Sequence, residues 1–411
     1  MRKNTYFYRL YLQSESNMTE KESALYSHYI IDGVRMDTTP AELLDECMDY
    51  EDFPYKQEDE FDDIIDESTE PPLSSFVYDN NMYEKYLRQV MQAVCEERSF
   101  RMLYPDHFTR LQISKALLGR LWSEGHFRLG DLRLWAQWEW NTRPLGNMAA
   151  FYHSAESASE YIYGLGVKLE DYVFLESDGE SNVKFFAWLD DAEDASDQDD
   201  GNDNHKMDNR DEVLFKSSPY ESRHPWIGDT RKCPHTIVPD KKSWLIYIPF
   251  DTCRFKIGGS LMAQTNFHNG GKAPSIEDPD YFIDCYEVVR ELTEDGIIIS
   301  GITVADGGIA AAAEKMAGKS GIALDLRGIL ASYQDSDICK VLFGEIPGAI
   351  IQISDENYDY VDSQFILQDI AYYPIGHPDP ESKGIRICTS SRTGVAEILL
   401  SLLGQASEGE D

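Results

Sequence analysis

The stretch Ile297–Gly308 reads IIISGITVADGG, an apolar run that ends in an acid and two glycines. Its apolar part is short and rich in isoleucine, which predicts a buried strand. The residues after it, Ile309–Ala317, are small and apolar and predict a helix. Glycines let backbone amides turn outward at such a junction, and a helix N-terminus adds partial positive charge. The stretch therefore predicts a strand–glycine–helix turn of an α/β fold.

A second junction of the same kind lies upstream. Trp244–Phe250 is predicted to be a buried strand, and Phe255–Gln264 contains a glycine pair, a hydroxyl and helix-forming residues. Asp278 and Pro279 predict the N-cap and first residue of the next helix. The two junctions supply the candidate phosphate- or nucleotide-binding residues, which are Gly258, Gly259, Ser260, Gln264, Gly307 and Gly308.

Two acidic residues accompany these junctions and are the candidate catalytic residues. Asp306 follows the strand directly, where a carboxylate is placed to hold a metal ion or a substrate amine. Glu345 lies in the turn segment VLFGEIPG, Val341–Gly348, and the nearest cations along the chain are Arg254 and Lys256. In the alternative interpretation the glycines only shape turns that the fold requires.

The order of these motifs carries a resemblance to a known family. A GGS…Q junction, a proline-initiated helix, a strand ending in DGG, a small-residue helix, LF-x-E-x-PG and a closing strand follow one another over roughly Trp244–His377. This order resembles the C-terminal domain of the aminoimidazole-ribonucleotide (AIR) synthetase and formylglycinamidine-ribonucleotide (FGAM) synthase superfamily. The resemblance implies an α/β layer domain, ATP and magnesium as cofactors, and a ribonucleotide substrate whose amide oxygen is phosphorylated. It also implies a homodimer or a partner subunit.

The chain departs from the family pattern at polar positions. The usual His-Asp-Val-Ser-Asp-Gly-Gly run is here ITVADGG, Ile302–Gly308, and the usual Leu-Phe-Ser-Glu is LFGE, Leu342–Glu345. No Gly- and Asp-rich ATP loop is found in residues 1–215. We therefore favour a catalytically reduced relative that retains a phosphate or nucleotide cleft. An active ATP-dependent ligase subunit that needs a partner chain, and an acidic non-catalytic scaffold, are the alternatives.

The distribution of acidic residues and the pattern of apolar residues divide the chain into four zones. Residues 1–75 are predicted to be an acidic extension, 76–189 a divergent α/β domain, 190–215 an acidic linker, and 216–411 the domain related to the AIR synthetase C-terminal domain. The second zone is a possible degenerate form of the family's N-terminal domain. Its predicted helices are 82–97, 111–123 and 144–164, with Asn147 as the N-cap of the third. Residues 126–140 are predicted to be a long strand or a hairpin, and 172–176 and 183–189 are predicted strands.

Composition excludes several classes of protein. The 411 residues carry a net charge of −37, which repels phosphate backbones, so we expect no binding to nucleic acid. No apolar run reaches the ~18 residues that a membrane span needs. The seven cysteines form no Cys-x-x-Cys pair, which argues against a zinc ribbon and fits a reducing cytoplasm.

Overall fold

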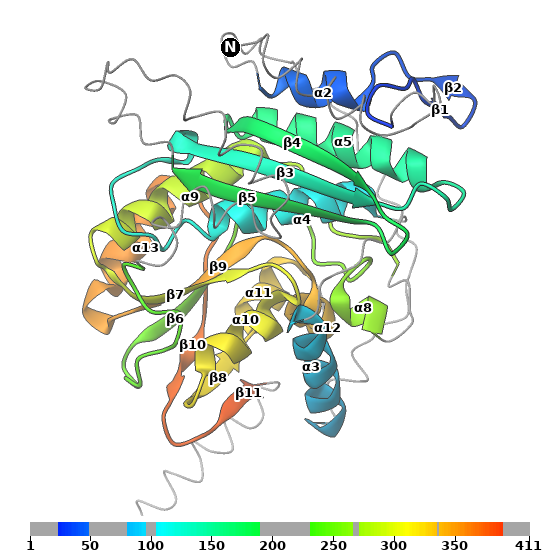
Figure 1. Cartoon of the computed structure of the whole chain (residues 1–411). Coiled ribbons are helices and arrows are strands. Elements are labelled where there is room, and N and C mark those ends of the chain that lie inside the picture. Colours follow the sequence, from blue (N-terminus) through cyan, green and yellow to red (C-terminus); the bar gives the residue numbers. More distant parts are fainter. Residues whose placement is uncertain are drawn as a thin grey trace, which may run out of the picture.

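The computed structural model describes residues 24–48, 80–95, 104–189, 231–265, 271–334 and 337–388. In these ranges the fold is α/β, as predicted, with a six-stranded and a three-stranded sheet in separate layers (Figure 1). The remaining residues, including the predicted linker 190–215 and most of the predicted extension 1–75, lie outside this description. No helix in the described ranges is long and apolar enough to cross a membrane.

The larger sheet has the strand order β11-β8-β10-β6-β9-β7. Neighbouring strands are antiparallel except β8 and β11, which are parallel. The strand β9 lies between β6 and the edge strand β7 and is buried along its whole length, which explains its mostly apolar sequence GAIIQI. The six strands are β6 (Trp244–Pro249), β7 (Ile298–Val304), β8 (Gly321–Asp325), β9 (Gly348–Ile353), β10 (Tyr373–Asp379) and β11 (Gly384–Cys388).

Helices cover both faces of this sheet because side chains alternate between faces along each strand. On β6, Ile246 and Ile248 enter one hydrophobic core with α9, whereas Leu245 and Tyr247 enter a second core with α10 and α12. The helices of this half are α8 (Leu261–Thr265), α9 (Pro279–Glu294), α10 (Gly308–Ala317), α11 (Arg327–Ser332), α12 (Ile338–Phe343) and α13 (Tyr358–Leu367), with the 3-10 turn η4 (Asp355–Asn357).

The smaller sheet has β3 at its centre, parallel to β4 and antiparallel to β5. The helix α5 connects β3 to β4, as a parallel pair requires. Trp138 and Trp140 are fully buried and lie against Phe151 of α5, so the alternate tryptophans of β3 serve packing. Its strands are β3 (Leu132–Trp140), β4 (Lys168–Glu176) and β5 (Asn182–Leu189), and its helices are α4 (Pro105–Leu118) and α5 (Asn147–Gly164).

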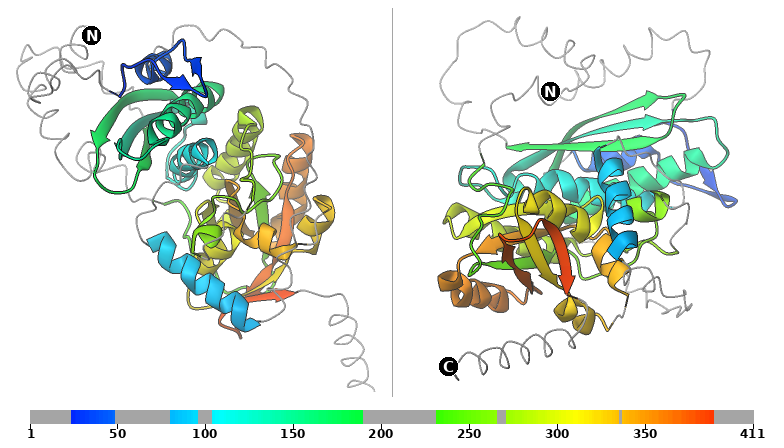
Figure 2. Two further views of the ribbon diagram at one scale, coloured as in Figure 1. Left: turned by 90° about the vertical axis from the view of Figure 1, so that its right-hand side faces the viewer. Right: turned by 90° about the horizontal axis from the view of Figure 1, so that it is seen from below.

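The helices α4 and α5 lie between the two sheets, and their apolar side chains share one core with α9 and the larger sheet (Figure 2). The helix α3 (Asn80–Cys95) packs on the other side, in the core of α10 and α12. A small N-terminal unit packs on α5; it consists of β1 (Ile30–Ile31), β2 (Val34–Arg35) and α2 (Pro40–Glu46).

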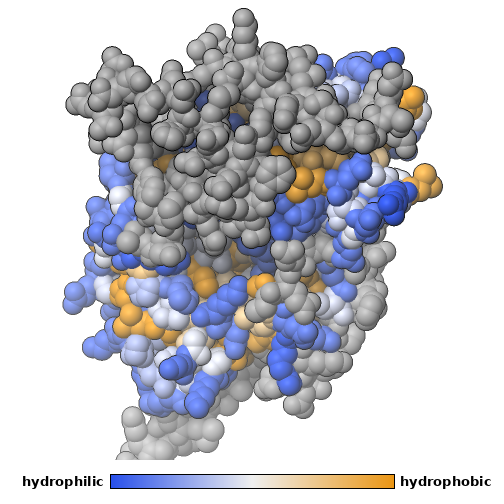
Figure 3. Space-filling model, in the orientation of Figure 1, coloured by the Kyte–Doolittle hydropathy of each residue, from blue (hydrophilic) through white to orange (hydrophobic). Residues whose placement is uncertain are grey.

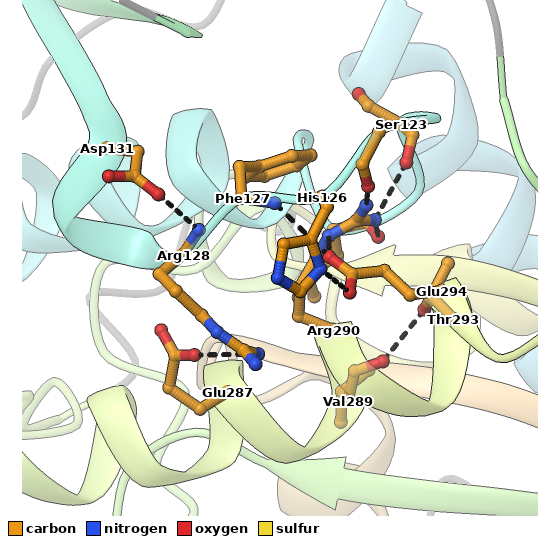
Figure 4. A network of polar contacts seen from close by, with 12 residues as sticks. Ser123, His126, Phe127, Arg128, Asp131, Glu287, Val289, Arg290, Thr293 and Glu294 are labelled. Carbon is orange, nitrogen blue, oxygen red and sulfur yellow. Dashed lines mark hydrogen bonds and ion pairs between the residues drawn. The ribbon is translucent and has the colours of Figure 1, made fainter.

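The buried guanidinium of Arg290 binds α9 to the segment that follows α4 (Figure 4). Arg290 is fully buried and its guanidinium donates to the carbonyls of Leu121 and Ser123, both at 2.7 Å. Its Nε lies 3.2 Å from Glu294, which also accepts from His126. These groups satisfy carbonyls beyond the end of α4, ahead of the 3-10 turn η2 (Leu129–Asp131). Arg290 thereby holds the two halves together.

Three sequence predictions in the first half need correction. The helix predicted at 111–123 is α4, which begins at Pro105 and ends at Leu118, because proline suits the first helical position. The strand predicted at 126–140 begins only at Leu132. Asn147 is not an N-cap: Gly146 caps α5 with φ 86°, and the Asn147 amide donates to the carbonyl of Asn141 at 2.7 Å.

Candidate functional site

Glu345 connects the two glycine junctions. One carboxylate oxygen, Oε1, accepts from the amide of Leu261 at 2.9 Å and from the amide of Gly307 at 2.8 Å. The side chain is fully buried. These two amides begin α8 and precede α10, so a carboxylate of the chain itself lies at both helix N-termini. We call residues 258–260, 306–308 and Glu345 the glycine joint.

Two glycines of the joint press directly against other backbone. A Cβ on Gly258 would lie 2.5 Å from the carbonyl oxygen of Gly271. A Cβ on Gly308 would lie 2.7 Å from the carbonyl oxygens of Leu342 and Gly344. Real Cβ atoms do not approach so closely, so these positions exclude larger residues for packing reasons.

The other two glycines, Gly259 and Gly307, are covered by side chains; both have left-handed backbone, as does Gly308. Gly259 has φ +71°, and the ring of Tyr104 lies 2.9 Å from the place of a Cβ. The Tyr104 hydroxyl donates to the carbonyl of Gly271 at 2.5 Å. Gly307 has φ +81°, and Val90 of α3 lies 2.8 Å from the place of its Cβ. Protein atoms therefore fill the space that the missing glycine side chains leave.

Asp306 forms an ion pair with α4. Its Oδ2 lies 2.6 Å from Nζ of Lys115, and its Oδ1 accepts from Nε2 of Gln112 at 3.1 Å. Only 9% of the Asp306 side chain is exposed, against 50% for Lys115. Sequence reasoning missed both partners, although their spacing of three residues on one helix placed them on a common face.

The remaining predicted residues have local roles. The Ser260 hydroxyl accepts from the amide of Ala263 at 3.2 Å, and the Gln264 side chain donates back to the carbonyl of Gly259 at 2.8 Å. Arg254 is exposed and Lys256 is half-buried. The cation that lies against Asp306 is thus neither of these but Lys115.

The end of β7, just before Asp306, is packed under Trp122. The indole Nε1 donates to Oγ1 of Thr303 at 3.0 Å, and that hydroxyl donates to the carbonyl of Leu118 at 3.1 Å. A Cβ on Gly301 would lie 2.1 Å from the same indole ring. Ile302 and Ala305 are buried and apolar. This segment therefore contributes packing where it meets α4.

A further buried acid, Asp251, lies near the N-terminus of α9. It accepts from the amides of Cys253, Glu277 and Asp278 at 2.8–3.1 Å, and burial raises the pKa of its carboxyl. Sequence reasoning did not single it out. Within the described ranges no group of three or more His, Cys, Asp and Glu side chains is arranged to hold a metal ion.

The chain is similar in sequence to phosphoribosylformylglycinamidine synthases. A phosphoribosylformylglycinamidine synthase from Arabidopsis thaliana, named as probable, is 23% identical over 69% of this chain and 18% of its own length. The human phosphoribosylformylglycinamidine synthase is 24% identical over 35% of this chain and 11% of its own. Among solved structures, PurL of Thermotoga maritima in complex with FGAR superposes with a TM-score of 0.47 and 10% identity, over 71% of this chain and 42% of that one. No protein-family profile matches the chain.

The fold and the glycine joint define a layered α/β protein with two strand–glycine–helix junctions. The chain is thus similar in sequence to phosphoribosylformylglycinamidine synthases, with low identity, which agrees with the resemblance that its motif order carries. It spans less than a fifth of the length of these curated relatives.

Proposed function

We propose that the chain is a catalytically reduced relative of FGAM synthase. It binds a ligand or a partner protein and does not catalyse a ligase reaction. The observation that carries this proposal is the ion pair between Asp306 and Lys115. Asp306 is the acid that the chain retains from the family's Asp-Gly-Gly run. An ammonium at 2.6 Å neutralises that carboxylate and competes with any role in handling metal or substrate.

The surroundings of Asp306 do not suit magnesium. Magnesium takes oxygen ligands in octahedral geometry, whereas the groups at the two Asp306 oxygens are an ammonium and an amide N–H. The joint does not suit an ATP phosphate either. The amides of Leu261 and Gly307 already donate to Glu345, and the glycine Cα atoms face protein. We therefore derive no step through either cofactor.

The lost polar residues of the family run support the same conclusion. Ile302 and Ala305 occupy the places of the family's His and Ser and are buried among apolar side chains. Thr303 occupies the place of the first Asp and donates to Leu118 of α4. Groups that serve chemistry must stay accessible to substrate, and these three serve packing instead.

We propose that the first half descends from the family's N-terminal domain, with domain limits near 76–189 and 216–411. The match to the plant relative supports this, because 69% of the chain is longer than the part that follows Leu189. We also propose a cytoplasmic location, which the free thiols of Cys47, Cys233, Cys253, Cys285 and Cys339 support.

Calorimetry with the full chain tests the proposed function. ATP and ADP are titrated with and without magnesium, formylglycinamide ribonucleotide is added, and phosphate release is followed with ammonium chloride as a nitrogen source. We expect no phosphate release above buffer. ATP binding without turnover would identify a nucleotide-binding protein. The absence of any binding would favour the alternative, an acidic non-catalytic scaffold.

One outcome contradicts the proposal. Ribonucleotide-dependent phosphate release that is lost in Asp306→Asn and kept in Glu356→Gln, an exposed control, would show an active ligase subunit. Because ammonium replaces a partner that supplies ammonia, the absence of a partner of that kind does not mask such activity.

A further inference from the structure

The outer face of α13 presents large apolar side chains to solvent. Leu367 is 74% exposed, Ile366 64% and Tyr360 45%. Tyr360 and Leu367 are seven residues apart and so lie on one stripe of the helix, with Ile366 beside it. The inner face, in contrast, is fully buried through Val361 and Phe365. The helix therefore has two apolar faces, of which one packs on the protein.

The helix α13 lies at the margin of the molecule, beside α9 (Figure 1). Figure 3 shows apolar atoms at the surface on the side where α13 lies, bordered by hydrophilic residues. Scattered single apolar residues need no explanation, but three on one short helix form a patch.

Carboxylates lie close to the patch along the chain. Asp355 and Glu356 belong to η4, Asp359 and Asp362 to α13, and Asp369 follows it. The sequence contains no lysine or arginine between Lys340 and Lys383. On the neighbouring helix, Asp280 and Asp284 of α9 are exposed as well. The surface therefore combines an apolar centre with acidic neighbours, and η4 and α13 contain no lysine or arginine.

We propose that the outer face of α13 binds a basic amphipathic segment of a partner protein. Leucine-like side chains of that segment would cover Ile366, Leu367 and Tyr360, while its lysines and arginines would meet the acidic neighbours. A second copy of this chain is disfavoured, because a two-fold contact places the same patch against itself and brings the two sets of acidic neighbours together.

The test measures binding of defined peptides to the full chain by fluorescence anisotropy. The probe is a leucine–lysine peptide with the period of an amphipathic helix. A scrambled peptide of the same composition is the control for charge alone, since a net charge of −37 attracts any polycation. The expected result is tighter binding of the amphipathic peptide.

A double variant locates the site. Ile366→Ser with Leu367→Ser is expected to weaken amphipathic binding about tenfold or more, because apolar contact is lost. Leu145→Ser is the matched control, since Leu145 is 97% exposed but lies before α5. Glu356→Gln is expected to lower the salt dependence of binding. Thermal unfolding of each variant checks that the fold is unchanged.

Three results would overturn the proposal. The scrambled peptide could bind as tightly as the amphipathic one, or Leu145→Ser could weaken binding as much as the double variant does. Analytical ultracentrifugation could also show a dimer of the wild-type chain that the double variant abolishes, which would assign the patch to a second copy.

Discussion

Lys115 of α4 and Asp306 at the end of β7 lie 2.6 Å apart and form an ion pair between the two halves of the chain. The Lys115 side chain is half exposed to solvent, whereas the Asp306 side chain is almost fully buried. It is held from both directions, because Gln112 donates to the second oxygen of the same carboxylate.

Removal of the ammonium should destabilise the protein moderately. Lys115→Met leaves a nearly buried carboxylate with one donor fewer, and we expect a loss of about 1 kcal/mol, since half of the lysine is exposed. Urea unfolding measures this loss. Lys319→Met, at an exposed lysine, is the control and should change stability by less than about 0.5 kcal/mol. Equal effects of the two variants would show that the pair contributes nothing specific.

Glu345 should matter more to stability than Lys115 does. Glu345→Ala leaves two buried amides without their charged acceptor, and we expect a loss of about 3 kcal/mol or more. Glu345→Gln keeps an oxygen in place and should lose about half as much. The measurement is the free energy of unfolding, with exposed Glu356→Gln as the control. A Glu345→Ala variant that is as stable as the wild-type chain would contradict the role of Glu345 in holding the glycine joint.

Alanine substitutions at Gly307 and Gly296 distinguish the cost of backbone strain from the cost of crowding by neighbouring side chains. Both have left-handed backbone, with φ +81° and +69°, but only Gly307 is crowded. Gly296→Ala should cost about 1 kcal/mol through backbone strain alone. Gly307→Ala should cost about 2 kcal/mol more, because its Cβ would lie 2.8 Å from Val90. Hydrogen exchange in α3 should rise only in Gly307→Ala, and equal exchange in both variants would count against the packing of α3 on the joint.

Buried thiols give a pH prediction. Burial raises the pKa of Cys339 to about 12 and also raises that of Cys233. An unfolded thiol ionises near its ordinary pKa of about 8.5, so folding stability is full below that pH and falls as the pH rises toward 12. Urea unfolding at a series of pH values should show this decline.

The rate of alkylation tests the raised pKa of Cys339 directly. At pH 8 iodoacetamide should label Cys339 of the folded chain slowly, and labelling in urea should be fast because the thiolate is the nucleophile. Mass spectrometry of the digested protein gives both rates. Rapid labelling of the folded chain at pH 8 would contradict the raised pKa of Cys339.

Local patterns in the sequence determined much of the second half. The apolar run of β7 and the cap formed by Asp278 and Pro279 depend on interactions between near neighbours, and so does the left-handed backbone at Gly259 and Gly307. Such signals persist in one sequence without any tertiary context. They were sufficient for the α/β fold and for the resemblance to FGAM synthases.

Only the tertiary structure decided the site. Lys115 meets Asp306, Val90 covers Gly307, and Glu345 joins two helices through contacts between residues far apart in the chain. No periodicity records such contacts, because a lysine on an exposed helix face looks alike whether it meets solvent or a buried acid. The sequence thus determined where the chain turns and with what residues, and the packing of α3 and α4 on those turns decided what surrounds them.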